Sequence, residues 1–290
     1  MPTLDTIARA PAKILFIGDS GSGKTGALAS LANAGYELFI QDFDNGAGVL
    51  VPFVKPEFYK NVHVAPLVDK VRISEIGPVC EGAPRAFAKS CALLDNWKDG
   101  DEAFGGVKSW GPNRVLVIDS MTMQGQAILR AIRHDAQTPP SDNTHPSQWG
   151  SGQDRQEGVL EELYDPTIQC HIIVTAHITF IGGEDSFRGL KSKEEKEAPL
   201  LSRPIIVPAP RVEKGYPSAL GKKLPPRIGR FFNVMLLAKT NTATGKREIL
   251  TVPEQAIDVK CPARVASPLT IESGLLTVFE AIVGPRKENT

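Results

Sequence analysis

The chain has 290 residues, 41% of them hydrophobic, and its 33 basic and 33 acidic side chains give a formal net charge of zero at pH 7. This balance excludes attraction of nucleic acid by the overall charge, so any such contact needs a local basic patch. The sequence contains no apolar run long enough to cross a membrane, no secretion signal and no C-x-x-C pair among its four cysteines. We therefore expect a cytoplasmic protein with reduced thiols and no membrane contact.

Apolar runs alternate with amphipathic stretches along the chain, which predicts an α/β fold with a mostly parallel, doubly wound sheet and helices on both faces. We expect strands at residues 13–17, 36–41, 61–65, 114–119, 170–176, 231–238 and 247–252. We expect helices at residues 24–34, 83–97, 121–135, 153–164 and 271–283. Residues 137–150 and 182–203 fit no regular element, and loops of such length are usually functional. The expected organisation is one domain over residues 1–290, with a core of about 10–252 and a C-terminal extension of about 253–290.

The first expected strand runs directly into a phosphate-binding loop. Residues 18–25 match the pattern G-x-x-x-x-G-K-[ST], which is the most specific signal in the chain. Glycines let the backbone N–H groups surround phosphate oxygens, and the helix that follows directs its positive end at the same anion. Lys24 is expected to reach the β- and γ-phosphates, and the Thr25 hydroxyl to bind Mg²⁺. The predicted nucleotide-binding residues are Gly18, Asp19, Ser20, Gly21, Ser22, Gly23, Lys24 and Thr25.

A second strand supplies a carboxylate. Residues 115–120 read Val-Leu-Val-Ile-Asp-Ser, an apolar run that ends in an acid. A buried parallel strand of this kind delivers its acid to the edge of the sheet where the phosphate loop lies, which is the Walker B arrangement. We expect Asp119 to hold Mg²⁺, although the same pattern also fits an ordinary strand end with an Asp helix cap.

Two other expected strands also end in polar residues. Asp42 and Asp44 follow the second strand, and would share one face if the strand continued. Either could orient and deprotonate the water that attacks the γ-phosphate, or both could belong to a solvated Asp-Asn-Gly turn. His177 follows a further buried strand, where it could sense the γ-phosphate or serve a structural role.

Residues 211–230 form a basic stretch that is interrupted by glycine and proline, with Glu213 as its one acid. Such a segment suits phosphate, either of nucleic acid or of a nucleotide held by a neighbouring subunit, and a solvated surface is the alternative. The residues expected to make this contact are Lys222, Lys223, Arg227 and Arg230.

Together these blocks resemble the RecA-like P-loop ATPases, and within them the Sak-type phage ATP-binding proteins that act as single-strand annealing recombinases. The likeness is carried by the phosphate loop, the acidic end of the second strand, and residues 115–120 and 174–177. It extends to residues 221–225 and 231–234, and so covers roughly residues 10–240. The family commonly has Glu where Asp44 stands and Gln where His177 stands.

The resemblance implies an ATPase that uses ATP and Mg²⁺ and binds single-stranded DNA. It also implies a homo-oligomeric filament or ring with ATP between subunits, and a single-strand-binding protein as a further partner. In that family the loops at residues 137–150 and 182–203 would face DNA, and Lys222, Lys223 or Arg227 would reach a neighbour's nucleotide. The host cell cytoplasm is then the expected location.

Other functions share parts of this pattern. A RecA-type helicase or helicase-loading ATPase has all the same motifs, and an ATP-dependent assembly protein would need no turnover. A small-molecule kinase uses the same phosphate loop but adds a mobile lid, and no segment has a clear lid signature. ATP turnover with and without single-stranded DNA separates these functions.

Overall fold

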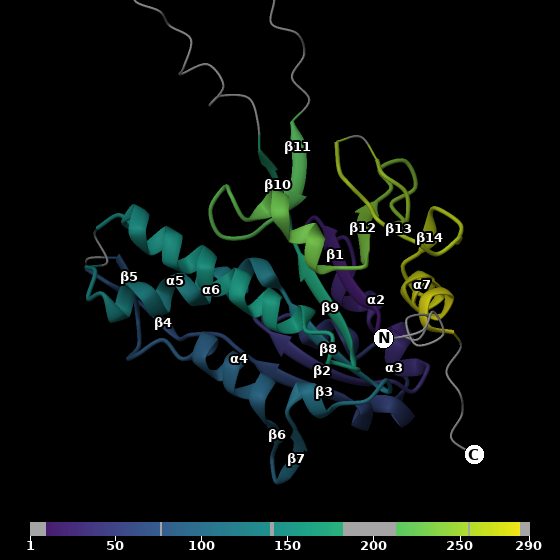
Figure 1. The fold of residues 1–290 in the computed structure, drawn as a ribbon, viewed down its shortest axis with the longest axis horizontal. Helices are drawn as coiled ribbons and strands as arrows, with labels where there is room; N and C mark the ends of the chain where they lie inside the picture. The colour runs from purple at the N-terminus through teal and green to yellow at the C-terminus, as the bar shows by residue number, and fades with distance from the viewer. Residues whose placement is uncertain (1–9, 76, 140–141, 182–212, 255, 285–290) are drawn as a thin grey trace, which may run out of the picture.

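An eight-stranded sheet forms the centre of the computed structural model, which describes residues 10–75, 77–139, 142–181, 213–254 and 256–284 (Figure 1). The strand order across the sheet is β14-β13-β12-β1-β9-β8-β2-β3. Six neighbouring strands are parallel and two are antiparallel. The parallel strands are β1 (Lys13–Gly18), β2 (Glu37–Asp42), β3 (Val62–Pro66), β8 (Arg114–Asp119), β9 (His171–Ala176) and β12 (Val234–Thr240). The antiparallel strands are β13 (Arg247–Leu250) and β14 (Leu269–Thr270).

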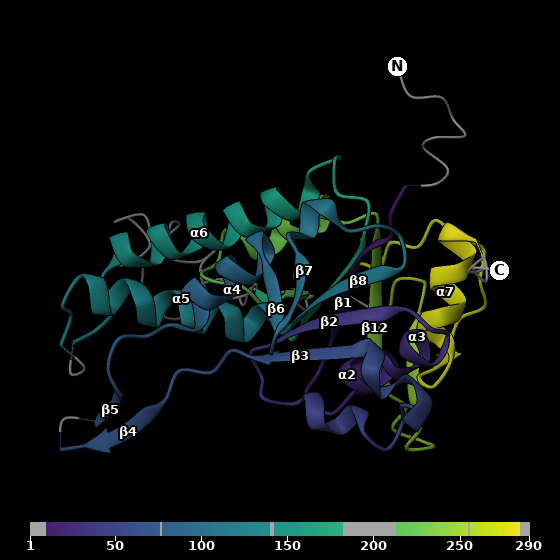
Figure 2. The same ribbon diagram turned by 90° about the horizontal axis from the view of Figure 1, so that it is seen from below.

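Helices cover both faces of this sheet (Figures 1 and 2). On one face lie α4 (Ala86–Asp95), α5 (Met121–Asp135) and α6 (Pro146–Tyr164). On the other lie α3 (Ala29–Asn33) and α7 (Gly274–Val283). The predicted class, a mostly parallel doubly wound α/β sheet with helices on both faces, is confirmed. Among the described helices, none combines the length and the apolar character that crossing a bilayer requires.

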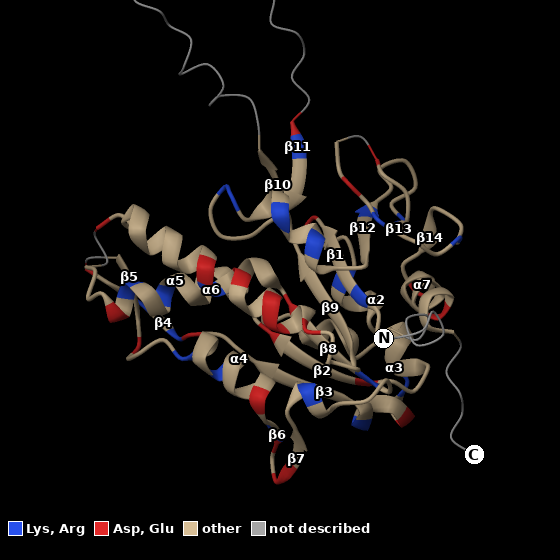
Figure 3. Cartoon of the chain, viewed as in Figure 1, with Lys and Arg blue, Asp and Glu red and all other residues tan. Residues whose placement is uncertain are grey.

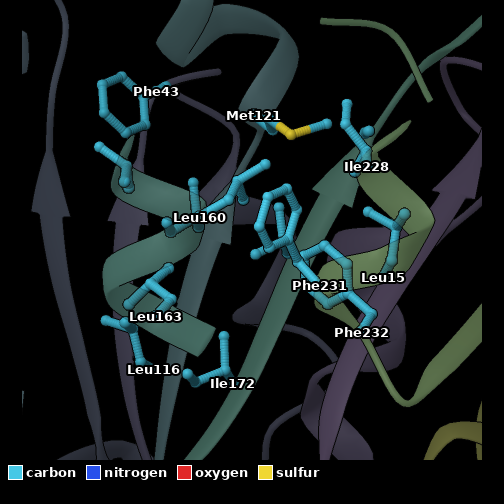
Figure 4. Close-up of a cluster of buried hydrophobic side chains, with 14 of the residues drawn as sticks. Leu15, Phe43, Leu116, Met121, Leu160, Leu163, Ile172, Ile228, Phe231 and Phe232 are labelled. Atoms are coloured by element: carbon cyan, nitrogen blue, oxygen red, sulfur yellow. The ribbon is translucent and has the colours of Figure 1, made fainter. Parts of the chain in front are cut away.

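Side chains of the central strands alternate between two hydrophobic cores, as the two-residue period of a strand requires. In β1, Leu15 and Ile17 enter the core beneath α5 and α6, whereas Ile14 and Phe16 enter the core beneath α3 and α7. Figure 4 shows the first core, where leucines of α6 meet strand side chains such as Leu116. This burial on both faces explains why the strands read as continuous apolar runs in the sequence.

Several predicted boundaries are wrong. The helix expected at 24–34 is two short helices, α2 (Lys24–Ala27) and α3, which meet at Leu28. The segment 137–150 is only partly a loop, because α6 begins at Pro146 and not at residue 153. Proline suits the first turn of a helix, and His145 caps it with Gln148 in a capping box. The strand expected at 231–238 begins at Val234, after a short 3₁₀-helix, η7 (Pro225–Phe231).

Three two-stranded pairs outside the main sheet were not predicted. Their strands have three or four residues each, too few for a clear alternation of polar and apolar side chains. They are β4 (Val71–Ser74) with β5 (Gly77–Cys80), β6 (Trp97–Asp99) with β7 (Glu102–Gly105), and β10 (Ile178–Ile181) with β11 (Lys214–Pro217). The predicted loop at 182–203 lies outside the described residues.

The buried imidazole of His171 connects the start of β9 to the residues that precede β1. Its Nδ1 accepts a hydrogen bond from the Ala12 N–H at 3.0 Å. Burial lowers the pKa of His171 to about 4, and the backbone hydrogen bond with Pro112 opposes this only partly. The ring is therefore neutral in the folded chain at pH 7.

We predict that the chain loses stability as the pH falls from 7 to 5, because the unfolded chain takes up a proton at His171 that the folded chain excludes. The contribution of the neutral His171 ring to the free energy of unfolding is complete above about pH 6.5 and is about 2 kcal/mol smaller at pH 5. Urea unfolding at both pH values measures it. His171→Gln should show a smaller loss by this amount, and the exposed control His134→Gln should behave as the wild type does. Equal losses in the wild type and His171→Gln would contradict the prediction.

Candidate nucleotide-binding site

The phosphate loop connects β1 to α2 and closes on its own lysine. The Lys24 Nζ donates hydrogen bonds to the backbone oxygens of Gly18 at 2.8 Å and Asp19 at 2.9 Å. Burial lowers the pKa of Lys24, whereas the nearby carboxylates of Asp119, Asp44 and Asp19 raise it. An anion that enters the loop can replace these two backbone oxygens as the acceptor of the Lys24 ammonium group.

Glycine is needed at one point of this loop for two reasons. Gly23 has a φ of 95°, in the left-handed region that other residues rarely adopt. A Cβ there would lie 2.9 Å from Ile271 Cγ1 and 3.0 Å from Arg247 Cδ. The C-terminal part of the chain therefore lies directly against the loop. The helix α2 has only four residues, so it has no long helix dipole to offer. The donors available to phosphate are therefore the backbone N–H groups of the loop.

The carboxylate of Asp119, at the end of β8, connects this strand to α2 and to β9. The Thr25 hydroxyl donates to Asp119 Oδ2 at 2.7 Å, and the Thr175 hydroxyl at the end of β9 donates to Asp119 Oδ1. Burial raises the pKa of Asp119, while the bonds from Thr175 and Thr25 lower it. The two residues predicted to hold Mg²⁺, Thr25 and Asp119, are thus in direct contact, and Thr175 is an additional partner of the carboxylate.

The two acids after β2 have different surroundings. The strand ends at Asp42, whose two carboxylate oxygens accept the backbone N–H groups of Gly46 at 3.0 Å and Ala47 at 2.9 Å. Asp44 instead lines the cavity above the loop, and accepts hydrogen bonds from Ser120 Oγ at 2.7 Å and Ser120 N at 3.2 Å. The strand does not continue to Asp44, so the condition under which both acids would share a face is not met. Asp44 is the acid available to a ligand.

His177 lies opposite Asp44. Its Nε2 is 3.6 Å from Asp44 Oδ2, and its backbone N–H donates to Thr122 Oγ1 at 3.0 Å. The position follows from the strand order, because β9 lies between β1 and β8 and so delivers its end between the phosphate loop and Asp119. His177 therefore lies at the same end of the cavity as the two carboxylates.

A cavity of about 480 Å³ unites these groups, and its volume suits a ligand the size of a nucleotide. Lys24, Thr25, Asp44, Asp119 and His177 all line it. Sequence reasoning missed other parts of the lining, among them Asn33, Val49, Pro52, Phe53, Arg247, Ile271 and Glu272. None of these belongs to a local motif, and only the folded sheet brings β13 and the residues after β14 to the loop.

The predicted basic contact residues do not line this cavity. Arg227 and Arg230 both lie in η7 and both approach Glu157 Oε1 of α6, at 3.3 Å and 2.5 Å. Lys222 and Lys223 precede η7, in a segment that Leu220 connects to the core through Ile128 and Ile132 of α5. Arg211, part of the same stretch, lies outside the described residues.

Comparison with known proteins gives a likeness at the level of structure. Neither a protein-family model nor a curated protein matches the sequence. Among solved structures, the RadB recombinase is similar over 85% of this chain and 85% of its own, with 16% sequence identity and a TM-score of 0.41.

We predict that Asp44→Asn leaves nucleotide affinity unchanged and slows ATP turnover by about 10²-fold or more, because the amide cannot accept a proton from water. Asp42→Asn is the matched control. It should cost about 1–3 kcal/mol of stability through a lost backbone acceptor and leave turnover of the folded protein nearly unchanged. Turnover assays with calorimetric titration of an ATP analogue measure both. Normal turnover in Asp44→Asn with loss in Asp42→Asn would reverse the two assignments.

Proposed function

We propose that this chain is a RecA-like ATPase that binds ATP with Mg²⁺ and acts on single-stranded DNA as an annealing recombinase of the phage type. One observation supports it above the others: the Thr25 hydroxyl of the phosphate loop and the Asp119 carboxylate of β8 are hydrogen-bonded at 2.7 Å. A loop threonine paired with a strand-end acid is the pair of ligands that P-loop ATPases use for Mg²⁺.

The donor set fits Mg²⁺. This ion prefers oxygen ligands and is commonly bound by one or two carboxylates together with substrate phosphates. Thr25 and Asp119 offer a hydroxyl and a carboxylate, and within the described residues no group of three or more His, Cys, Asp or Glu competes as a metal site. When bound, the ion would neutralise charge that develops on the phosphates.

The lining of the cavity supports ATP as the ligand. Its polar end holds Lys24, Asp44 and His177, which suits a triphosphate and an attacking water. Its other walls include Phe53 and Ile271, which offer apolar surface to a nucleobase. Asp44 would orient the water, because two hydrogen bonds from Ser120 fix its carboxylate while part of it stays open to the cavity.

Single-stranded DNA and a filament or ring of subunits are the finer part of the proposal. They are supported by the resemblance of the motifs and by the basic residues near α5 and α6. Lys222, Lys223, Arg227 and Arg230 are the candidates for contact with phosphate of DNA or of a neighbouring nucleotide. To bind phosphate, Arg227 and Arg230 would have to break their ion pairs with Glu157, or contact the carboxylate and the phosphate together.

We expect Lys24→Ala to abolish most ATP turnover, by about 10²-fold or more, while the fold survives, because the ammonium group serves phosphate and not the core. Phosphate release and thermal unfolding measure the two effects. Lys13→Ala is the matched control, since this lysine lies at the opposite end of β1 and donates to the backbone oxygens of Leu163 and Asp165. Its turnover per folded molecule should match the wild type. Full turnover in folded Lys24→Ala would refute the site.

A further inference from the structure

A second groove, of about 460 Å³, lies between the β4–β5 hairpin and the C-terminal half of α5. The hairpin extends away from the main sheet, beside the end of α5 (Figures 1 and 2). The groove shares no lining residue with the nucleotide cavity. No motif of the sequence pointed to it.

One wall of this groove is basic. Arg130, Arg133 and His134 are spaced i, i+3 and i+4 on α5, so they share one face of the helix about 5–6 Å apart. Figure 3 shows the Lys and Arg positions of the chain in blue, those of α5 included. The lining includes no aspartate or glutamate. His134 lies 3.7 Å from Asp135, so its charge, when present, is partly compensated.

Among the described residues, no carboxylate forms an ion pair with either arginine. Arg133 donates to Thr144 Oγ1 and to the backbone oxygens of Pro139 and Asp142, all at 2.9 Å. These neutral acceptors fix the guanidinium without cancelling its charge. Arg130 has no ion-pair partner within the described part of the chain. A positive groove in a chain of zero net charge attracts anions locally.

The opposite wall is apolar. Directly paired residues of antiparallel strands share one face, which puts Val71 with Cys80 and Ile73 with Pro78 on the same side of the hairpin. Val71, Pro78 and Cys80 of this face line the groove, together with Val79 of the other face. Ile73 continues the face and is 83% exposed. Arg72 pairs with Val79 on the other face, but its own side chain is not part of the lining.

We propose that this groove binds single-stranded nucleic acid, with backbone phosphates on Arg130 and Arg133 and bases against the apolar face of the hairpin. The inference rests on the proposed function, for which it names the place of the DNA. A single strand exposes charged phosphates and apolar base faces together, which matches one basic and one apolar wall. A duplex hides its base faces in the stack, and so cannot use the second wall.

The groove is connected to the nucleotide cavity by one rigid element. Ser120, which holds Asp44, caps α5 by accepting the Met123 N–H, and the same helix carries Arg130 and Arg133 at its other end. If a bound DNA strand shifts α5, it therefore also acts on Asp44, the acid that would orient the attacking water. DNA bound in the groove is thus positioned to change ATP turnover.

Binding of fluorescein-labelled oligo(dT) to the full chain, followed by anisotropy over a range of KCl concentrations, tests the site. Arg130→Gln keeps a polar side chain and removes the positive charge that would contact one phosphate. It should weaken binding about fivefold and reduce the slope of log affinity against log salt by roughly 0.7. Ile73→Glu, on the exposed apolar face, should weaken binding by at least as much. Arg72→Gln, which removes the same charge from the other face of the hairpin, should leave the slope nearly unchanged.

ATP turnover provides the second measurement. Arg130→Gln should keep DNA-free turnover and lose most of its stimulation by oligo(dT). If the wild type binds oligo(dT) but Arg130→Gln and Ile73→Glu bind it equally well, the groove is not the site, while the proposed function stands. If the wild type hydrolyses ATP and binds no oligo(dT), both the groove and the DNA part of the proposed function are overturned. Equal weakening by Arg72→Gln would show a diffuse charge effect and also overturn the groove.

Discussion

The hydrogen bond between the Thr25 hydroxyl and the Asp119 carboxylate is the interaction on which the rest of the site depends. The two residues are 94 positions apart, and they meet because β9 holds β1 and β8 at a fixed spacing in the parallel sheet. Thr175 of β9 occupies the second oxygen of the same carboxylate. Two strand ends and the start of α2 thus converge on one buried acid, and the acid is satisfied only when the sheet is assembled. Burial without these partners would leave a charged group unpaired, at a high cost in stability.

Those parts of the structure that depend on local sequence were predictable. The buried strands are continuous apolar runs, and the phosphate loop is a contiguous pattern, so Lys24, Thr25 and Asp119 could be assigned before any fold was known. Asp42 and Asp44 could not be separated, because the point at which β2 ends decides which acid faces the cavity. The chain turns after Asp42, where the backbone N–H groups of Gly46 and Ala47 donate to its carboxylate. The sequence does not reveal these hydrogen bonds.

The remaining lining of the site depends on long-range packing. Arg247 and Ile271 belong to the antiparallel edge and the C-terminal part of the chain, and the close approach at Gly23 is what brings them to the loop. The groove beside α5 has the same origin, since a short hairpin and a helix come together without any shared motif. α5 itself was predicted with correct ends, because Ser120 caps it and its apolar side chains recur at helical spacing. One helix therefore joins a site that was predictable to one that was not.

The central claim, that Thr25 and Asp119 hold a magnesium–nucleotide complex, is tested most directly by calorimetric titration of the wild-type chain with a non-hydrolysable ATP analogue, once with Mg²⁺ and once with EDTA. Nucleotide and metal that share a site must strengthen each other's binding. We expect affinity about tenfold or more higher with Mg²⁺, within the usual range of such coupling. Equal affinity in the two titrations, or no binding in either, would contradict the claim.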